Sequence, residues 1–93
     1  MISIDRFGNM QLNLDRSHLE QAGIVPGMRL EVALDAERYY AVAARTFADA
    51  RRGDVILYED AYRNVSIAIS NGNAAEVLGA REGQDVRIYL NVW

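Results

Sequence analysis

Apolar and polar residues alternate along most of this chain, which is the pattern of β-strands that bury one face. Met10, Leu12 and Leu14 fall on one side of an early segment, and polar residues fall between them. About seven such strands are expected, at residues 1–5, 10–14, 30–34, 39–44, 55–58, 65–69 and 86–92. Because residues 39–44 are mainly apolar at successive positions, we expect that strand to be buried on both faces.

Two short helices interrupt the strands. Residues 15–22 form the first, with Asp15 or Ser17 as its N-cap and Gly23 as its stop, and the second covers about residues 73–78. Short strands at spacings near ten residues, with no linker between them, indicate a single domain over residues 1–93. The predicted fold is all-β with minor α content, a small antiparallel β-barrel of about seven strands with two short capping helices.

One structural unit occurs twice: a short helix, a glycine stop, a four-residue turn and a strand. Residues 23–34 in the first copy parallel residues 79–90 in the second. The parallel is explained either by internal pseudo-symmetry or by two uses of a favourable way to end a helix and start a core strand. Two copies do not make a solenoid, and the repeat carries no chemistry by itself.

Composition limits the classes of function. The chain has no cysteine and one histidine, so no disulfide and no metal site is expected. Its net charge of −3, with ten scattered arginines as the basic residues, disfavours nucleic acid as a partner. No stretch approaches the roughly 18 apolar residues of a membrane span, and Met1 leads directly into strand-like alternation instead of a signal peptide. A cytoplasmic protein without a membrane partner is therefore expected.

Five short motifs follow one another in the order of a family signature. They are Asp5-Arg6-Phe7-Gly8-Asn9 with Asn13, Thr46-Phe47-Ala48-Asp49 with Gly53, Tyr58-Glu59, the run Ile67-Ala68-Ile69 that continues through Gly72-Asn73-Ala74-Ala75 to Gly79, and Gly83-Gln84-Asp85-Val86-Arg87-Ile88. Through them the chain resembles the C-terminal domain of the S-adenosylmethionine (SAM) hydroxide adenosyltransferases, which are relatives of the SAM-dependent fluorinases and chlorinases. The resemblance covers nearly the whole chain.

The resemblance implies a two-domain enzyme in which this β-rich domain supplies much of the adenine pocket. A larger N-terminal domain supplies the ribose and methionine contacts, and the pocket lies between neighbouring subunits of a trimer. We therefore expect a homo-oligomer, a trimer or dimer, and an N-terminal-domain partner chain. Because 93 residues leave no room for the larger domain, this chain is expected to bind an adenosine-type molecule without being catalytic alone.

The resemblance assigns seven residues to the ligand, and each has a structural alternative. They are Asp5, Phe7, Asn9, Phe47, Gly72, Asn73 and Ala74. The amide of Asn9 suits the donor and acceptor on an adenine edge, unless it serves only its own turn. The two phenylalanines would stack on the base, or else pack in the core. Residues 72–74 would present backbone groups, or Asn73 would only cap a helix, and Asp5 would face the ammonium group of methionine or be structural.

Two departures from the family pattern affect the methionine side of the pocket. Asp60-Ala61-Tyr62-Arg63 stands where the family commonly has a serine-rich turn, and Asn71 stands where an arginine is often found. Adenosine is therefore expected as the ligand before intact SAM, and no other cofactor is expected.

Two other interpretations of the function remain open. One is a non-catalytic oligomeric protein-interaction module, and the other is a DNA-binding regulator, because residues 2–34 also resemble the swapped-hairpin antitoxins and transition-state regulators. The negative charge disfavours the regulator.

Overall fold

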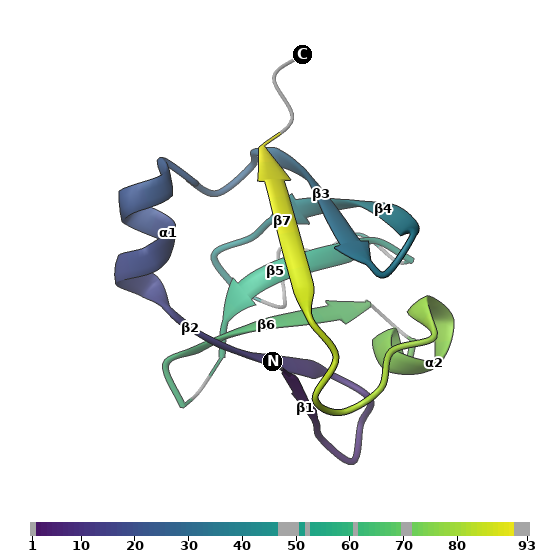
Figure 1. Ribbon diagram of the computed structural model, residues 1–93. Helices are drawn as coiled ribbons and strands as arrows, with labels where there is room; N and C mark the ends of the chain where they lie inside the picture. The colour runs from purple at the N-terminus through teal and green to yellow at the C-terminus, as the bar shows by residue number, and fades with distance from the viewer. Residues whose placement is uncertain (1, 47–50, 52, 61, 70–71, 91–93) are drawn as a thin grey trace.

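In the part of the chain that the structure describes, seven strands and two short helices make up the fold (Figure 1). The computed structural model describes residues 2–46, 51, 53–60, 62–69 and 72–90. The elements are β1 (Ile2–Ile4), β2 (Met10–Asp15), α1 (Arg16–Ala22), β3 (Arg29–Leu34), β4 (Glu37–Ala43), β5 (Val55–Glu59), β6 (Asn64–Ile69), α2 (Ala74–Leu78) and β7 (Val86–Leu90). The predicted all-β class with two short helices is confirmed.

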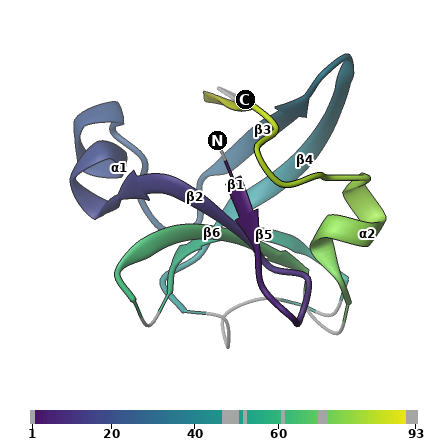
Figure 2. The ribbon, with the colours of Figure 1, turned by 60° about the horizontal axis from the view of Figure 1, so that its bottom comes forward.

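The strands form one curled sheet in the order β1-β2-β6-β5-β4-β3-β7. Neighbouring strands are antiparallel, except that β4 and β5 are parallel. The sheet is thus mixed, and it curls strongly into a half-barrel with β1 and β7 as its two edge strands. Figure 2 shows the curl from below, with both helices outside the strands at opposite sides of the molecule.

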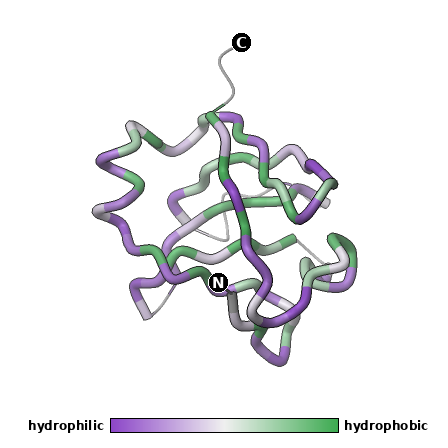
Figure 3. Tube along the Cα trace, in the orientation of Figure 1, coloured by the Kyte–Doolittle hydropathy of each residue, from purple (hydrophilic) through white to green (hydrophobic). Residues whose placement is uncertain are grey.

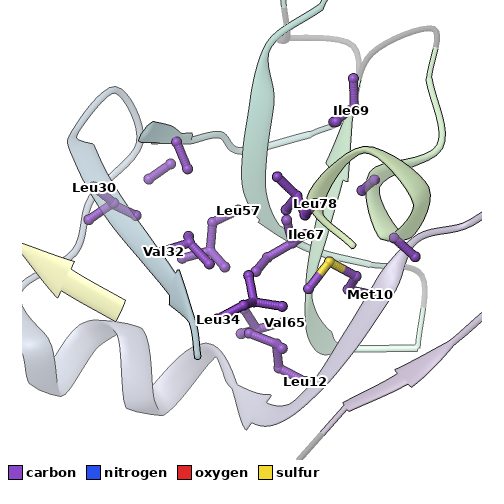
Figure 4. Close-up of a cluster of buried hydrophobic side chains, with 14 residues drawn as sticks. Met10, Leu12, Leu30, Val32, Leu34, Leu57, Val65, Ile67, Ile69 and Leu78 are labelled. Carbon is purple, nitrogen blue, oxygen red and sulfur yellow. The ribbon is translucent and has the colours of Figure 1, made fainter. Parts of the chain in front are cut away.

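The core lies inside the curl of the sheet (Figure 4). The alternation predicted for β3 is confirmed, because Leu30, Val32 and Leu34 are only 0%, 0% and 2% exposed. Met10 of β2 and Ile67 of β6 lie opposite each other in the sheet and are both fully buried. Figure 3 shows apolar and polar residues mixed along the strands, as expected where one strand face is buried and the other is not.

β4 is buried on one face only, so the prediction that it is buried on both faces is wrong. Ala41 and Ala43 lie in the core, whereas Tyr40 is 69% exposed. The sheet curls around a single core, and successive side chains of a strand point to opposite faces. Tyr40 therefore points away from the core despite its apolar ring.

Local sequence determines where each helix begins and ends. Asp15 is the N-cap of α1 and accepts hydrogen bonds from the backbone N–H groups of Ser17 and His18. The hydrogen bond from the Ser17 hydroxyl is the main cause that lowers the pKa of Asp15. Gly23 ends α1 in the left-handed conformation, and Asn73 caps α2. Neither helix has the length and apolar character needed to cross a membrane, among the residues that the structure describes.

The repeated unit reflects internal pseudo-symmetry. Gly23 and Gly79 end their helices with φ values of 78° and 67°, and the turns that follow are closed by equivalent backbone hydrogen bonds of 3.1 Å. The two repeated strands, β3 and β7, are antiparallel neighbours. Val32 lies opposite Ile88, its counterpart in the repeat, so a local two-fold axis passes through this pair.

Candidate functional site

The hairpin turn between β1 and β2, residues 5–9, is held together by the side chain of Asp5. Its Oδ1 atom accepts hydrogen bonds from the N–H groups of Phe7 and Asn9, both 2.9 Å long. Its Oδ2 atom accepts a 3.1 Å hydrogen bond from Nδ2 of Asn9. Gly8 has a φ of +83°, a conformation that L side chains rarely adopt. The turn therefore has a fixed shape that depends on both Asp5 and Gly8.

The turn at residues 72–74 leads from β6 into α2. Oδ1 of Asn73 accepts a 2.9 Å hydrogen bond from the backbone N–H of Glu76, which satisfies one N–H of the first helical turn. Gly72 donates its N–H to the carbonyl of Ile69 at 3.1 Å. A Cβ atom at Gly72 would lie 2.8 Å from Cγ2 of Ile69, so the tight bend requires glycine.

The two turns touch each other, although they are far apart in the sequence. The backbone N–H of Ala75 donates a 2.9 Å hydrogen bond to the carbonyl of Gly8. A Cβ atom at Gly8 would overlap the side-chain amide of Asn73. Gly8 thus allows the two turns to meet, and it brings the amides of Asn9 and Asn73 into one region.

The other predicted site residues differ in accessibility. Phe7 is 65% exposed at the tip of its turn, and the guanidinium carbon of Arg6 lies 4.9 Å from the centre of its ring. Phe7 is therefore not a core residue. Ala74 is 0% exposed, so a ligand would reach its backbone only after the turn rearranged. Phe47 lies outside the residues that the structure describes, and its predicted contact with the site stays a prediction.

Asp5 has a structural role, whatever its role toward a ligand. Its carboxylate accepts three hydrogen bonds from the 5–9 turn, out of about four acceptor positions that a carboxylate offers. The predicted contact with an ammonium group would have to use the remaining position. That contact stays a prediction.

A polar row beside the 5–9 turn was missed from the sequence. Ser3, Gln11, Ser66 and Tyr58 lie opposite one another across β1, β2, β6 and β5, so they share the sheet face away from the core. The hydroxyl of Ser3 donates to Oε1 of Gln11 at 3.0 Å, and that of Ser66 to Oδ2 of Asp60 at 2.7 Å. The alternation of polar residues in β2 and β6 was visible, but the row exists only through the register of four strands.

Burial raises the pKa of the Tyr58 hydroxyl, and the charges of Asp60 and Asp5 add to the effect. Tyr58 therefore remains a neutral hydroxyl, able to donate and accept hydrogen bonds, over the physiological pH range. Its nearness to Asp5 places one more polar group beside the 5–9 turn.

A separate groove of about 540 Å³ lies between α1 and the ends of β4 and β5. Its floor is apolar and includes Leu19, Ile24 and Leu57, and none of the predicted site residues that the structure describes lines it. No group of three His, Cys, Asp or Glu side chains is arranged to hold a metal ion in the part of the chain that the structure describes.

Comparison with known proteins identifies related sequences over nearly the full chain. Residues 1–87 match the model of the SAM hydroxide adenosyltransferase C-terminal domain. An (R)-S-adenosyl-L-methionine hydrolase from Salinispora tropica is 33% identical over 95% of this chain and 31% of its own length. A fluorinase from Actinopolyspora mzabensis is 32% identical over 88% of this chain and 28% of its own length. The chain thus spans about a third of the length of these relatives.

Solved structures show the same fold. An uncharacterized conserved protein from Thermotoga maritima superimposes with a TM-score of 0.88 at 24% identity, over 92% of this chain and 33% of that one. A conserved hypothetical protein from Thermus thermophilus gives a TM-score of 0.66 at 29% identity, over 91% of this chain and 32% of that one. In both proteins the matching part is about a third of the chain.

Proposed function

Since this chain belongs to the SAM hydroxide adenosyltransferase family, as a C-terminal domain of that family, we propose that it binds the adenine group of an adenosine-type ligand at the 5–9 and 72–74 turns. The observation that carries the proposal is the contact between the turns, through the hydrogen bond from Ala75 to Gly8. The resemblance assigned both turns to one adenine pocket, and they are adjacent although they are far apart in sequence.

The hydrogen bonds within the turns leave a donor and an acceptor of defined position. Nδ2 of Asn9 is directed to Asp5, which leaves Oδ1 of Asn9 as an acceptor. Oδ1 of Asn73 is used by the helix cap, which leaves Nδ2 of Asn73 as a donor. An adenine edge presents an amino donor next to a ring-nitrogen acceptor, which is the complementary pattern. Both orientations are held by contacts inside the protein, which supports the proposed match to this edge.

Phe7 would supply the stacking surface, since its ring is exposed beside the same turn. Stacking of a base on an aromatic ring contributes about 1–3 kcal/mol. The two turns cover only one side of a ligand, and small ligands gain most of their affinity from enclosure. We therefore expect weak binding of adenosine, and we propose that a separate N-terminal-domain chain supplies the rest of the pocket.

Adenosine and inosine should differ clearly in affinity. Inosine carries a carbonyl where adenosine carries the amino group, so it would oppose Oδ1 of Asn9 with a second acceptor. We expect adenosine to shift the amide signals of residues 7–9 and 72–75 in NMR titrations. Inosine should bind at least about tenfold more weakly, as the loss of about 1.4 kcal/mol implies. The proposal fails if adenosine at millimolar concentration shifts none of these signals, or if inosine binds equally well.

The isolated chain is expected not to convert SAM to adenosine and methionine. Hydrolysis needs a water molecule held in line with the 5′ carbon and a base that removes its proton. The 5–9 and 72–74 turns provide amide and backbone groups, and the Asp5 carboxylate is engaged by its own turn. The check is chromatography of the products with purified chain. Turnover that Asn9→Ala abolishes would contradict this expectation.

A second proposal is that the chain self-associates as a non-catalytic interaction module. Large apolar side chains are exposed at several places, including Tyr40, Tyr62 and Leu90. Such surface is commonly covered by association in proteins. We expect a dimer or trimer by light scattering at high protein concentration. A strictly monomeric species at that concentration would count against self-association but would leave the adenosine proposal intact.

A further inference from the structure

The groove beside α1 is framed by three segments that backbone hydrogen bonds hold in place. The N–H of Gly27 donates to the carbonyl of Ala43 at 2.7 Å, and the N–H of Ala43 donates to the carbonyl of Met28 at 2.8 Å. The N–H of Ala44 donates to the carbonyl of Leu57 at 2.9 Å. The loop after α1, the end of β4 and the middle of β5 are therefore tied together around the groove.

The groove lies where β4 and β5 separate. Ala43 and Leu57 are partners in the parallel ladder, β4 ends at Ala43, and β5 continues to Glu59. None of the residues of α1 is buried, and Leu19 remains half-buried although it packs against the core. A hollow of about 540 Å³ with an apolar floor is left between these elements. Its size falls within the range of small-molecule sites, about 300–1,000 Å³.

Two side chains of opposite charge lie beside the apolar floor of the groove. They are Arg45 and Glu59, which follow Ala43 and Leu57 by two residues each. Neither side chain forms an ion pair or a hydrogen bond within the part of the chain that the structure describes. The groove thus offers one cation and one anion to an added molecule.

The two charged residues of α1 that line the groove neutralise each other. Nε of Arg16 lies 3.3 Å from Oε1 of Glu20, one helical turn further on. A ligand with only a carboxylate would match Arg45 but not Glu59, and a ligand with only a cation would match Glu59 but not Arg45. The charges therefore favour a molecule that carries both signs and is neutral overall.

We propose that this groove binds a free α-amino acid with an apolar side chain. The carboxylate of the amino acid lies on Arg45, because a guanidinium can donate two parallel hydrogen bonds to a carboxylate. The ammonium group lies on Glu59. The side chain covers the apolar floor that Leu19, Ile24 and Leu57 form. An α-amino acid thus matches the cation, the anion and the apolar surface of the groove with one small molecule.

This site is independent of the proposed adenine site. None of the described residues that line the groove belongs to the 5–9 turn or the 72–74 turn. The 72–74 turn leads into α2, which lies on the opposite side of the molecule from α1 (Figure 2). Binding of an amino acid and binding of adenosine can therefore succeed or fail separately in one protein.

L-Leucine is a suitable probe of the groove. Added to the full chain with labelled methyl groups, it should shift the NMR signals of Leu19, Ile24 and Leu57. It should leave the amide signals of residues 7–9 and 72–75 unchanged, since those signals report the adenine site.

Two analogues of leucine test the two charges. 4-Methylpentanoate has the carbon skeleton of leucine without the ammonium group, and L-leucinamide lacks the carboxylate charge. Each analogue should bind at least about tenfold more weakly than leucine, because one hydrogen bond between charged groups is lost.

Two protein variants assign each charge to its residue. In Glu59→Gln, leucine should bind as weakly as 4-methylpentanoate binds to the unchanged protein. In Arg45→Gln, it should bind as weakly as leucinamide does. Arg51→Gln and Glu82→Gln are the matched controls, because these exposed residues do not line the groove. Both controls should leave leucine binding unchanged.

Three results would overturn the proposal. Leucine at millimolar concentration could shift none of the groove signals, or it could keep its full affinity in Glu59→Gln or Arg45→Gln. Equal binding of 4-methylpentanoate and leucine would indicate a site for a carboxylate with an apolar tail instead. Groove signals that shift with protein concentration alone would show that a second copy of the chain occupies the groove, which also excludes the proposal.

Discussion

Gly8→Ala is expected to lower the free energy of unfolding by about 3–4 kcal/mol and to abolish the adenosine response. Two costs combine at this position. Alanine at a φ of +83° is strained, and its Cβ atom would overlap the side-chain amide of Asn73. The overlap would separate the 5–9 turn from α2 and break the hydrogen bond from Ala75 to Gly8. Urea denaturation measures the loss of stability.

Gly23→Ala is the matched control for Gly8→Ala. Gly23 has a φ of +78°, but a Cβ atom there would have no neighbour within 4 Å. The Gly23→Ala variant should therefore lose only the free energy of unfolding that backbone strain costs, about 1–2 kcal/mol. It should leave the NMR response to adenosine unchanged, because α1 lies away from the two turns. Equal losses in the two variants would show that the contact with Asn73 contributes nothing.

Asp5→Ala and Asp60→Ala are each expected to lower the free energy of unfolding by about 2 kcal/mol. Their effects on adenosine binding are expected to differ. Each substitution removes a carboxylate that accepts three hydrogen bonds near its own turn. Only Asp5 orients the amide of Asn9, so only Asp5→Ala should abolish the adenosine response.

Asp60 and Asp5 make matching contacts: Oδ1 of Asp60 accepts hydrogen bonds from the N–H groups of Tyr62 and Asn64, as Oδ1 of Asp5 does from those of Phe7 and Asn9. Loss of adenosine binding in both variants would mean that binding reports general stability and not the 5–9 turn. Retention of binding in Asp5→Ala would mean that Asn9 does not need its carboxylate partner. Thermal unfolding of both variants, followed by circular dichroism, provides the stability comparison.

Features set by neighbouring residues were predictable from the sequence. Asp15 and Gly23 determine the ends of α1 through hydrogen bonds and backbone conformation within a few residues. The alternation in β3 predicted correctly which of its residues enter the core. Each of these features depends on side chains that lie close together in the chain, so an isolated sequence pattern is sufficient.

Features that depend on strand neighbours were not predictable. The parallel pairing of β4 with β5 and the outward position of Tyr40 follow from the order of the strands in the sheet. The polar row that includes Gln11 and Ser66 depends on register between strands that are distant in sequence. Local alternation gives no information on which strands become neighbours.

The candidate site was predictable only through the family resemblance. Composition did not indicate that residues 5–9 contact residues 72–74. The contact at Gly8 depends on how the whole sheet is arranged. The similarity of residues 60–64 to residues 5–9 was visible as a second Asp-x-aromatic-x-Asn sequence but was missed. In the second sequence Arg63 takes the position that Gly8 has in the first. Its positive φ could not be expected from the sequence, because residues other than glycine rarely adopt one.

Intermolecular nuclear Overhauser effects between adenosine and the labelled chain would show whether adenine lies between the 5–9 and 72–74 turns. We expect contacts from the adenine protons to the Phe7 ring and to the side-chain amides of Asn9 and Asn73. These contacts should disappear together in Gly8→Ala and persist in Gly23→Ala. Contacts at Leu19, Ile24 and Leu57 in the groove beside α1, or no contacts at saturating adenosine, would contradict an adenine site between the two turns.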